Sequence, residues 1–508
     1  MRTLLGVDVG TSSVKAVLYN PQTGKVAGAA AQEYPLHKPA PNYAEHEPED
    51  WWSAAVGAVR AVMTSTPGAQ VAGIGLCGQM HGTAFLDRAG ASIRPAIIWA
   101  DQRSGAECQE LIDQIGAGPF SSVTGTLPAA GFAAPTLLWL RKHEPRTLDR
   151  TQMLLMPKDY VRFRMTDTMA TDASDAAATA LFDVSIKAWS PEIVNAVGIS
   201  RSILPPIRDS ASVVGELTKT AAEALGLPAG IPVVTGCADQ PAQAFTNGLI
   251  RTGTASVTVG SGGQVFVPVV PDMESNVLFR LPTDPRVHVF NHALPGMWYV
   301  LGATLSAGLS LRWLRSLLGR SGDGKEAYAQ FSHEAGDVSP GANGLIFLPY
   351  LAGERTPHMD SHARATFVGL SYHHERGHLA RAVMEGVAFS LREALSISTA
   401  IGGAAKTVIA AGGAMESTVW RQIMADVLGI PLYQTGISET TGVGAALLAA
   451  LGTGMYEEYA DACALTSQSI HVTEPIPANQ ARYDALFVRY QGLYAKLRED
   501  FHALADEE

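Results

Sequence analysis

Residues Leu4–Tyr19, which read LLGVDVGTSSVKAVLY, decide how the first part of the chain folds. Two short apolar runs, Leu4–Asp8 and Val14–Tyr19, flank the turn residues Gly10-Thr11-Ser12, a pattern that predicts two strands joined by a tight turn. A third strand is predicted at Lys25–Gln32, after another turn-rich segment. The chain therefore opens as an antiparallel meander.

A helix and a buried strand complete this first pattern. Pro48–Met63 begins with proline and two acids and then carries apolar side chains at helical spacing, which predicts an amphipathic helix. Val71–Leu76 is apolar enough for a buried strand. Because three strands, a helix and a strand depart from strict alternation, we expect an α/β fold with mixed sheets flanked by helices.

The same kind of opening recurs in the second half of the chain. Ala255–Val259 and Gln264–Val269 flank the turn Gly260-Ser261-Gly262-Gly263, which predicts a second hairpin. Helical faces follow at 379–395 and 419–427. The architecture is therefore predicted to be duplicated, although the sequence itself is not visibly repeated.

This repeat predicts two domains, residues 1–248 and 249–508. The boundary near residues 246–253 rests on the repeated hairpin, because the composition there is not that of a linker. The length agrees, since 508 residues exceed the roughly 100–200 residues of one domain.

Composition excludes several classes of protein. Hydrophobic residues make up 47% and charged residues 17%, a balance typical of a soluble globular protein. The 37 Lys and Arg against 48 Asp and Glu give a net charge of −11 without a basic run, so no nucleic-acid partner is expected. Apolar runs fall short of the ~18 residues that cross a bilayer, and the chain starts directly with a strand, so we expect no membrane partner and a cytoplasmic location. The four cysteines form no CxxC pair, which argues against a disulfide framework or a cysteine zinc site.

Three short motifs resemble known sites without the context those sites need. Residues 73–78 fit the dinucleotide pattern GxGxxG, but no helix is predicted at the third glycine. Residues 319–326 nearly spell a P-loop, but they lack the Ser or Thr that binds magnesium. Residues 374–378 spell HExxH, but a glycine lies inside the motif and the helical pattern starts after it. We interpret all three as structural.

Asp8 stands at the end of the first strand, just before the turn. Its carboxylate can handle a metal, and the glycine, hydroxyl and backbone N–H groups of Gly10-Thr11-Ser12 can face a phosphate, with Lys15 close behind. A plain hairpin turn is the alternative. Two such loops, one opening each domain, favour a polyphosphate held between them.

Two glycine segments of the second half are also candidates. Gly260-Ser261-Gly262-Gly263 offers another small-residue nest for an anion. Gly412 and Gly413 follow an apolar strand and precede a helix, where glycine allows either close approach of a nucleoside or tight packing of strand and helix. The sequence leaves both explanations open.

Asp239 stands where the buried strand Ile231–Thr235 gives way to a helix. A carboxylate there can act as a general base or cap the helix, and spacing alone does not decide between them. Gln79-Met80-His81-Gly82 and Trp99-Ala100-Asp101-Gln102-Arg103 follow other strands and combine polar groups with aromatic or apolar ones. Such sets suit a sugar, although packing and ion pairing explain each of them as well.

In their order along the chain, these blocks resemble the FGGY carbohydrate kinases, and within that family the kinases of D-xylulose. The matching pieces are Asp8–Ser12, Gly78–Gly82, Pro157–Tyr160, Asp172–Ala177, the segment around Asp239, Leu348–His358, Gly369–Ser371 and Gly412–Ala414. The resemblance implies two ribonuclease-H-like domains, related to actin and hexokinase, with a cleft between them.

The resemblance also implies an activity and its site. The reaction is the phosphorylation of D-xylulose to D-xylulose 5-phosphate by ATP with Mg²⁺; phosphorylation of another ketose or polyol is the alternative within the family. By the same likeness, Asp239 is the catalytic base, and the residues that contact the sugar are Met80, His81 and Gln240. Asp8 holds Mg²⁺ directly or through water, and adenosine lies against Gly412 and Gly413. The residues implied to surround the phosphates are Thr11, Ser12, Lys15, Gly260, Ser261, Gly262 and Gly263. A homodimer is compatible with the resemblance.

Three departures from the family pattern matter. Gln240 stands where these kinases usually have Asn, and the second phosphate loop has one hydroxyl fewer than the usual Gly-Thr-Ser-Gly. The turn between Gly413 and Trp420 is one residue longer than usual. A rival of another class is an actin-like protein that binds ATP or senses sugar without catalysis, but that class is expected to lack a base, and Asp239 is present.

Overall fold

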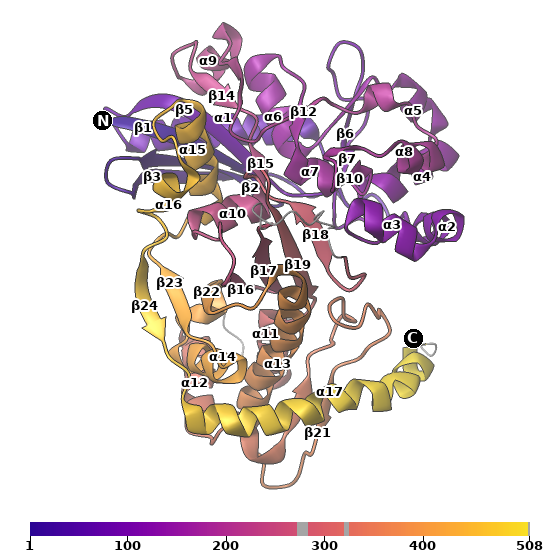
Figure 1. Cartoon of the computed structure of the whole chain (residues 1–508), viewed down its shortest axis with the longest axis vertical. Helices are drawn as coiled ribbons and strands as arrows, with labels where there is room; N and C mark the ends of the chain where they lie inside the picture. The colour runs from indigo at the N-terminus through magenta and orange to yellow at the C-terminus, as the bar shows by residue number, and fades with distance from the viewer. Residues whose placement is uncertain (272–282, 320–324, 506–508) are drawn as a thin grey trace. The chain divides into compact units, whose positions relative to one another are not determined.

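The amino-terminal meander forms as predicted (Figure 1). The computed structural model describes residues 1–271, 283–319 and 325–505. Strands β1 (Arg2–Val9), β2 (Ser13–Asn20) and β3 (Lys25–Glu33) pair antiparallel in sequence order. Helix α1 (Pro48–Ser65) then leads to β5 (Gln70–Gly78), which lies parallel to β1 and makes the sheet mixed.

Contacts group the chain into two units. The first comprises Met1–Ile250, Val270–Trp298 and Gly436–Gln468, and the second comprises Arg251–Val269, Tyr299–Thr435 and Ser469–Glu508. The predicted division after residue 248 falls beside the first crossing. The hairpin repeat did not indicate the two later segments of the first unit, because contacts between distant segments leave no periodic pattern in a sequence.

The sheet of the first unit has helices on both faces. Its strand order is β13-β14-β5-β1-β2-β3, with β15 also paired to β5. Alternate residues of β1 and β2 belong to two separate cores, one that contains α1 and one that contains α15. The strands added here are β13 (Val213–Glu216), β14 (Pro232–Val234) and β15 (Cys237–Ala238).

Helix α15 (Thr440–Gly452) packs unusually close to the first sheet, as the gold helix over the indigo strands shows (Figure 1). A Cβ on Gly6 would lie 1.8 Å from the carbonyl oxygen of Gly442, and a Cβ on Gly75 would lie 1.9 Å from that of Ala445. Glycine in these strands is therefore required by the approach of the helix backbone. This contact joins the 436–468 segment to the amino-terminal sheet.

Further elements complete the first unit. The helices are α2 (Gly105–Ile115), α3 (Ala117–Thr124), α4 (Ala133–His143), α5 (Pro145–Arg150), α6 (Pro157–Thr166), α7 (Ala173–Ala177), α8 (Pro191–Val197), α9 (Lys219–Leu225), α10 (Asp239–Thr246) and α16 (Tyr459–Cys463). Short strands are β4 (Glu45–His46), β6 (Ala84–Leu86), β7 (Ala96–Ile97), β8 (Met153–Leu155), β9 (Thr171–Asp172), β10 (Phe182–Asp183), β11 (Ala188–Trp189), β12 (Ile207–Arg208) and β18 (His288–Asn291).

The second unit repeats the opening of the first. Strands β16 (Thr254–Val259) and β17 (Gly263–Val269) form the predicted hairpin, and β22 (Thr407–Ala411) lies parallel to β16 as β5 does to β1. The predicted architectural duplication is therefore confirmed. Its strand order runs β19-β17-β16-β22-β23-β24, with β19 (Trp298–Thr304), β23 (Leu432–Thr435) and β24 (Ser469–Thr473).

Helices of the second unit cover this sheet. Helix α13 (Arg376–Gly402) packs on β17, and α17 (Pro477–Ala505), yellow in Figure 1, packs along α14 (Thr418–Leu428). The other elements are α11 (Gly308–Leu317), α12 (Lys325–Gly336), β20 (Ile346–Leu348) and β21 (Thr366–Val368). Among the described helices, none is long and apolar enough to cross a bilayer.

Two of the three motifs set aside earlier have structural surroundings in the described part of the chain. Residues 73–78 lie within strand β5, and part of the P-loop-like segment, 320–324, lies outside the described residues. Helix α13 begins inside the HExxH sequence, two residues after His374. Glu375 and His378 form a reciprocal capping box there. This cap explains the motif, because His374 precedes the helix that carries His378.

Candidate active site

Carboxyl ends of parallel strands bring the first-unit candidates to one edge of the sheet. In the paired registers, Asp8 on β1 and Cys237 on β15 both lie beside Cys77 of β5. Gln79-Met80-His81 follows the end of β5, and Asp239 follows the end of β15. The residues expected to serve metal, sugar and proton transfer therefore emerge together.

Asp8 presents one free carboxylate oxygen to this edge. Its Oδ2 accepts a 2.5 Å hydrogen bond from the hydroxyl of Thr441, whereas its buried Oδ1 has no hydrogen-bond partner among the residues that the structure describes. Burial raises the pKa of Asp8, and the Thr441 hydrogen bond and the positive charge of Lys15 oppose that rise. A buried, unsatisfied carboxylate oxygen fits a hard cation such as Mg²⁺, which prefers oxygen ligands.

Asp239 is the first residue of α10, directly after the N-cap residue Ala238. Its Oδ1 is likewise buried and lacks a partner among the described residues. Burial is the main reason that the pKa of Asp239 rises to about 7, the negative charge of Asp8 adds to the rise, and hydrogen bonding at Gln240 opposes it. A carboxylate with this pKa accepts a proton readily near neutral pH.

Several polar side chains in and beside the first turn already interact with other residues of the protein. The hydroxyl of Thr11 donates to Oε1 of Gln79 at 3.3 Å and accepts from the indole of Trp99 at 2.9 Å. Lys15 forms an ion pair with Glu439 at 3.2 Å. Ser12 is exposed. Thr11 and Lys15 therefore have protein partners that a phosphate would have to join or replace.

His81 is held in one orientation. Its backbone has a φ of 71°, its ring stacks on Phe132 at 3.8 Å, and its Nδ1 lies 2.6 Å from the carbonyl oxygen of Ala178. Because a carbonyl only accepts, Nδ1 carries the proton, and in that tautomer Nε2 is the acceptor. Met80 beside it is buried. Within Trp99–Arg103, Asp101 and Arg103 form an ion pair at 2.7 Å. Ion pairing therefore explains these two residues of the block.

A buried ionic network supports the strand that leads to Asp239. Lys158 is fully buried and lies 2.6 to 3.1 Å from the carboxylates of Asp159, Asp172 and Asp175. Asp172 accepts from the hydroxyl of Ser174, which in turn accepts from the backbone N–H of Ala238. Reasoning from sequence missed this role, although Pro157–Tyr160 and Asp172–Ala177 were among the family-like blocks that signalled it.

The second unit contains a large cavity at the carboxyl ends of β16 and β22. Its volume is about 910 Å³, and it is lined by Gly260, Ser261, Arg312, Tyr328, Gly413, Glu416, Ser417 and Trp420, with further apolar and small side chains. A volume of this order accommodates a nucleotide-sized ligand. Gly260, Ser261 and Gly413, which the resemblance assigns to the nucleotide, therefore line one cavity, and the binding of a nucleotide there stays a prediction.

The two adjacent glycines Gly412 and Gly413 have different roles. Gly412 has a φ of 91°, and a Cβ there would lie 2.4 Å from the carbonyl oxygen of Val259. A Cβ on Gly413 would meet no described atom within 4 Å. Packing therefore explains Gly412, whereas the open space beside Gly413 belongs to the cavity. The packing explanation is confirmed for Gly412, and the approach of a nucleoside to Gly413 stays a prediction.

The loop Gly260–Gly263 is divided in the same way. Gly260 and Ser261 line the cavity, and their carbonyl oxygens accept from the first N–H groups of α11, at Gly308 and Leu309. A Cβ on Gly262 or Gly263 would lie within 2.7 Å of Thr304, so these two glycines serve packing. Arg312, which the sequence reasoning missed, donates a 3.0 Å hydrogen bond to Ser261 and adds a positive charge to the cavity wall.

Comparison with known proteins identifies the family. The N-terminal domain of the "FGGY family of carbohydrate kinases" matches residues 3–246, and the C-terminal domain of the same family matches residues 257–453. The chain belongs to the FGGY family of carbohydrate kinases. The resemblance inferred from the motifs is confirmed, and this FGGY chain is an enzyme of the sugar-kinase type.

Relatives of this FGGY kinase span its whole length. A xylulose kinase of Lactococcus lactis subsp. lactis is 34% identical over 519 residues, which cover 100% of this chain and 99% of the relative. The crystal structure of xylulose kinase from Rhodospirillum rubrum has a TM-score of 0.90 at 32% identity and covers 99% of this chain and 100% of that one. A glycerol kinase of Gloeobacter violaceus is 33% identical over 465 residues, 90% of each chain. The predicted fold class is confirmed.

Proposed function

We propose that this FGGY kinase phosphorylates D-xylulose with ATP to give D-xylulose 5-phosphate. The observation that carries the proposal is the pair of carboxylates Asp8 and Asp239 at the ends of two strands that both pair with β5, each with an unsatisfied buried oxygen among the described residues. The full-length similarity to xylulose kinases supports this sugar as the substrate.

Each carboxylate has its own role in the proposal. Asp239 takes the proton from the terminal hydroxyl of the sugar, since its pKa of about 7 makes it a base that is ionised at slightly alkaline pH. Asp8 holds Mg²⁺ through Oδ1, directly or through water, while Thr441 fixes its other oxygen. When bound, Mg²⁺ neutralises charge on the phosphates during transfer.

Sugar and nucleotide are assigned to separate units. His81 accepts a hydrogen bond from a sugar hydroxyl at Nε2, Met80 gives apolar contact, and Gln240 beside the base donates or accepts at a further hydroxyl. ATP lies in the cavity of the second unit, with adenosine against Gly413. Its phosphates lie near Gly260, Ser261 and Arg312. Within the first unit, Thr11, Ser12 and Lys15 are the candidates for phosphate binding.

A kinase for another polyol is the second candidate. The relative named glycerol kinase, 33% identical over 90% of this chain, favours it. The family pattern leaves this alternative open because sugars that differ by one hydroxyl or carbon are distinguished by few contacts.

A substrate panel tests the proposal. Purified protein is incubated with ATP, Mg²⁺ and D-xylulose, D-ribulose, L-xylulose, glycerol or gluconate, ADP release is measured by a coupled assay, and the product is identified by NMR. We expect kcat/KM to be highest for D-xylulose and the phosphate to be on O5. A higher value for glycerol would favour the second candidate, and no turnover of any sugar would contradict both.

A further inference from the structure

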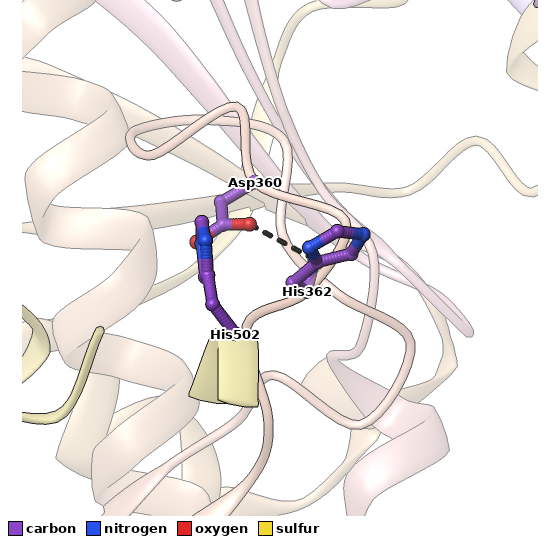
Figure 2. A group of neighbouring side chains, drawn as sticks. All are labelled: Asp360, His362 and His502. Atoms are coloured by element: carbon purple, nitrogen blue, oxygen red, sulfur yellow. Dashed lines mark hydrogen bonds and ion pairs between the residues drawn. The ribbon is translucent and has the colours of Figure 1, made fainter. Parts of the chain in front are cut away.

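Three potential metal ligands of the second unit converge at a place that the proposed reaction does not use (Figure 2). Asp360 and His362 come from the loop between β20 and β21, and His502 comes from the last turn of α17. Their ligand atoms all lie within 4.8 Å of one another. The imidazole rings of His362 and His502 approach edge to face, with centroids 5.1 Å apart.

The carboxylate of Asp360 is anchored from two sides. Its backbone exchanges two 2.8 Å hydrogen bonds with Glu354, and its Oδ1 accepts from the backbone N–H of His362 at 2.9 Å. Its Oδ2 accepts from the hydroxyl of Tyr494 at 2.7 Å and lies 3.0 Å from Nε2 of His502. The carboxylate is therefore held toward the two histidines before any ligand binds.

We propose that Asp360, His362 and His502 form a binding site for a divalent transition-metal ion of the zinc type. Two imidazole nitrogens and one carboxylate oxygen are a ligand set that zinc and cobalt accept well, whereas Mg²⁺ prefers oxygen ligands alone. Three protein ligands leave a fourth position for water.

The distances suit such an ion. Zinc bonds of about 2.0–2.2 Å place tetrahedral ligand atoms roughly 3.3–3.6 Å apart. Asp360 and His502 are already separated by 3.0 Å, and the exposed side chain of His362 has room to rotate onto the same point. Only side-chain adjustment is needed to close the site.

The fold gives this site a structural role. An ion bound there joins the carboxyl-terminal turn of α17 to a loop that lies 142 residues earlier in the chain. Tyr494 acts as the outer partner that orients the ligating carboxylate, and its ring is stacked on His358 at 3.5 Å. The metal is therefore expected to stabilise the second unit and to leave phosphoryl transfer to Asp8 and Asp239.

A simple ion pair between Asp360 and His502 is the competing explanation, and His362 distinguishes the two. The hydrogen bond from His362 to Asp360 uses the backbone N–H and not the ring. His362→Ala therefore keeps that bond and the contact between Asp360 and His502, but removes one of the three metal ligands. Its side chain is exposed, so the variant is expected to fold.

Metal titration of the chelator-treated full chain tests the proposal. Zn²⁺ binding is measured by calorimetry, and Co²⁺ binding by the visible absorption of tetrahedral cobalt. We expect one ion per chain, a loss of at least about 100-fold in affinity for His362→Ala, and a loss of about 10- to 100-fold for Tyr494→Phe. The control His471→Ala removes an exposed histidine of β24 and should bind as the wild type does.

Thermal unfolding gives a second readout. Zn²⁺ should raise the Tm of the wild type and of His471→Ala, but not that of His362→Ala. The proposal is overturned if His362→Ala binds zinc with wild-type affinity, or if binding is lost instead on replacing His373 and His378, which lie close to the start of α13. Unchanged kinase activity of His362→Ala with Mg²⁺ would separate this site from the proposed reaction.

Discussion

The hydroxyl of Thr441 donates a 2.5 Å hydrogen bond to Oδ2 of Asp8, a residue 433 positions earlier in the chain. The bond fixes one carboxylate oxygen and leaves Oδ1 directed elsewhere, without a partner among the described residues. The close approach of α15 to β1, which Gly6 permits, places Thr441 there. The segment that returns to the first unit therefore helps to build the proposed metal site.

Thr441→Val removes this hydrogen bond and keeps the shape of the side chain. Because a hydrogen bond to a charged group contributes about 1.5–3 kcal/mol, the Mg²⁺ concentration for half-maximal activity should rise about tenfold or more. Thr441→Ser, which retains the hydroxyl, should stay close to the wild type. Steady-state rates at varied Mg²⁺ measure both, and identical Mg²⁺ curves for wild type and Thr441→Val would contradict the assignment.

Asp239 should make the folded protein less stable as pH rises. Its pKa in the folded state is raised from 3.8 to about 7, so the folded protein disfavours the ionised form. The resulting destabilisation is absent below about pH 4, grows between pH 4 and 7, and is complete above pH 7. Asp239→Asn removes it.

The Tm of Asp239→Asn should therefore exceed that of the wild type at pH 8 by more than it does at pH 5. Asp149→Asn, at an exposed carboxylate of α5, serves as the control and should show no such difference. Thermal unfolding at the two pH values measures the effect. If the Tm of Asp239→Asn exceeded that of the wild type equally at both pH values, or fell below it at pH 8, ionised Asp239 would not destabilise the folded protein.

Gly412 and Gly413 should respond oppositely to substitution. Gly412→Ala would place a Cβ 2.4 Å from a backbone oxygen at a φ of 91°, so its Tm should fall clearly. Gly413→Val should keep its Tm, but its side chain enters the cavity and the KM for ATP should rise about tenfold or more, equivalent to about 1.4 kcal/mol. Gly492→Val changes another glycine whose added Cβ would meet no described atom and that does not line the cavity, so the Tm and the KM for ATP should both stay unchanged. An unchanged KM for Gly413→Val would remove the nucleotide from this cavity.

The sugar site should depend on His81 more than on Met80. An unpaired buried polar partner is worth about 1–3 kcal/mol, so His81→Ala should lower kcat/KM for D-xylulose roughly tenfold to a hundredfold, whereas Met80→Leu keeps the apolar contact and should be mild. Calorimetry with an ATP analogue should give nearly wild-type affinity for His81→Ala. If His81→Ala weakened binding of the ATP analogue as much as it lowered kcat/KM for D-xylulose, the assignment of the two ligands to separate units would be contradicted.

Local patterns in the sequence predicted much of the fold. The meander of β1, β2 and β3, helix α1, strand β5 and the second hairpin all have a hydrophobic period or a turn composition that neighbouring residues reveal. Asp8, His81 and Asp239 could be chosen because chemistry-bearing residues followed predicted strands.

Contacts between distant segments could not be predicted from such local patterns. The packing of α15 on Gly6 and Gly75, the network around Lys158, the place of Arg312 on the cavity wall and the meeting of His362 with His502 each join parts of the chain that share no period. A glycine inside a strand was the one available signal for the first of these. Adjacent glycines such as Gly412 and Gly413 look alike in sequence, and only their surroundings distinguish them.

The turnover of Asp239→Asn with D-xylulose tests the central claim most directly. Asn keeps the shape of the side chain and removes the proton acceptor, and general-base catalysis contributes about 10²- to 10⁴-fold. We predict a fall in kcat of that size with unchanged affinity for an ATP analogue. For the wild type, kcat/KM should rise with pH through about 7 and then level off. A variant that turns over D-xylulose at close to the wild-type kcat would contradict the account.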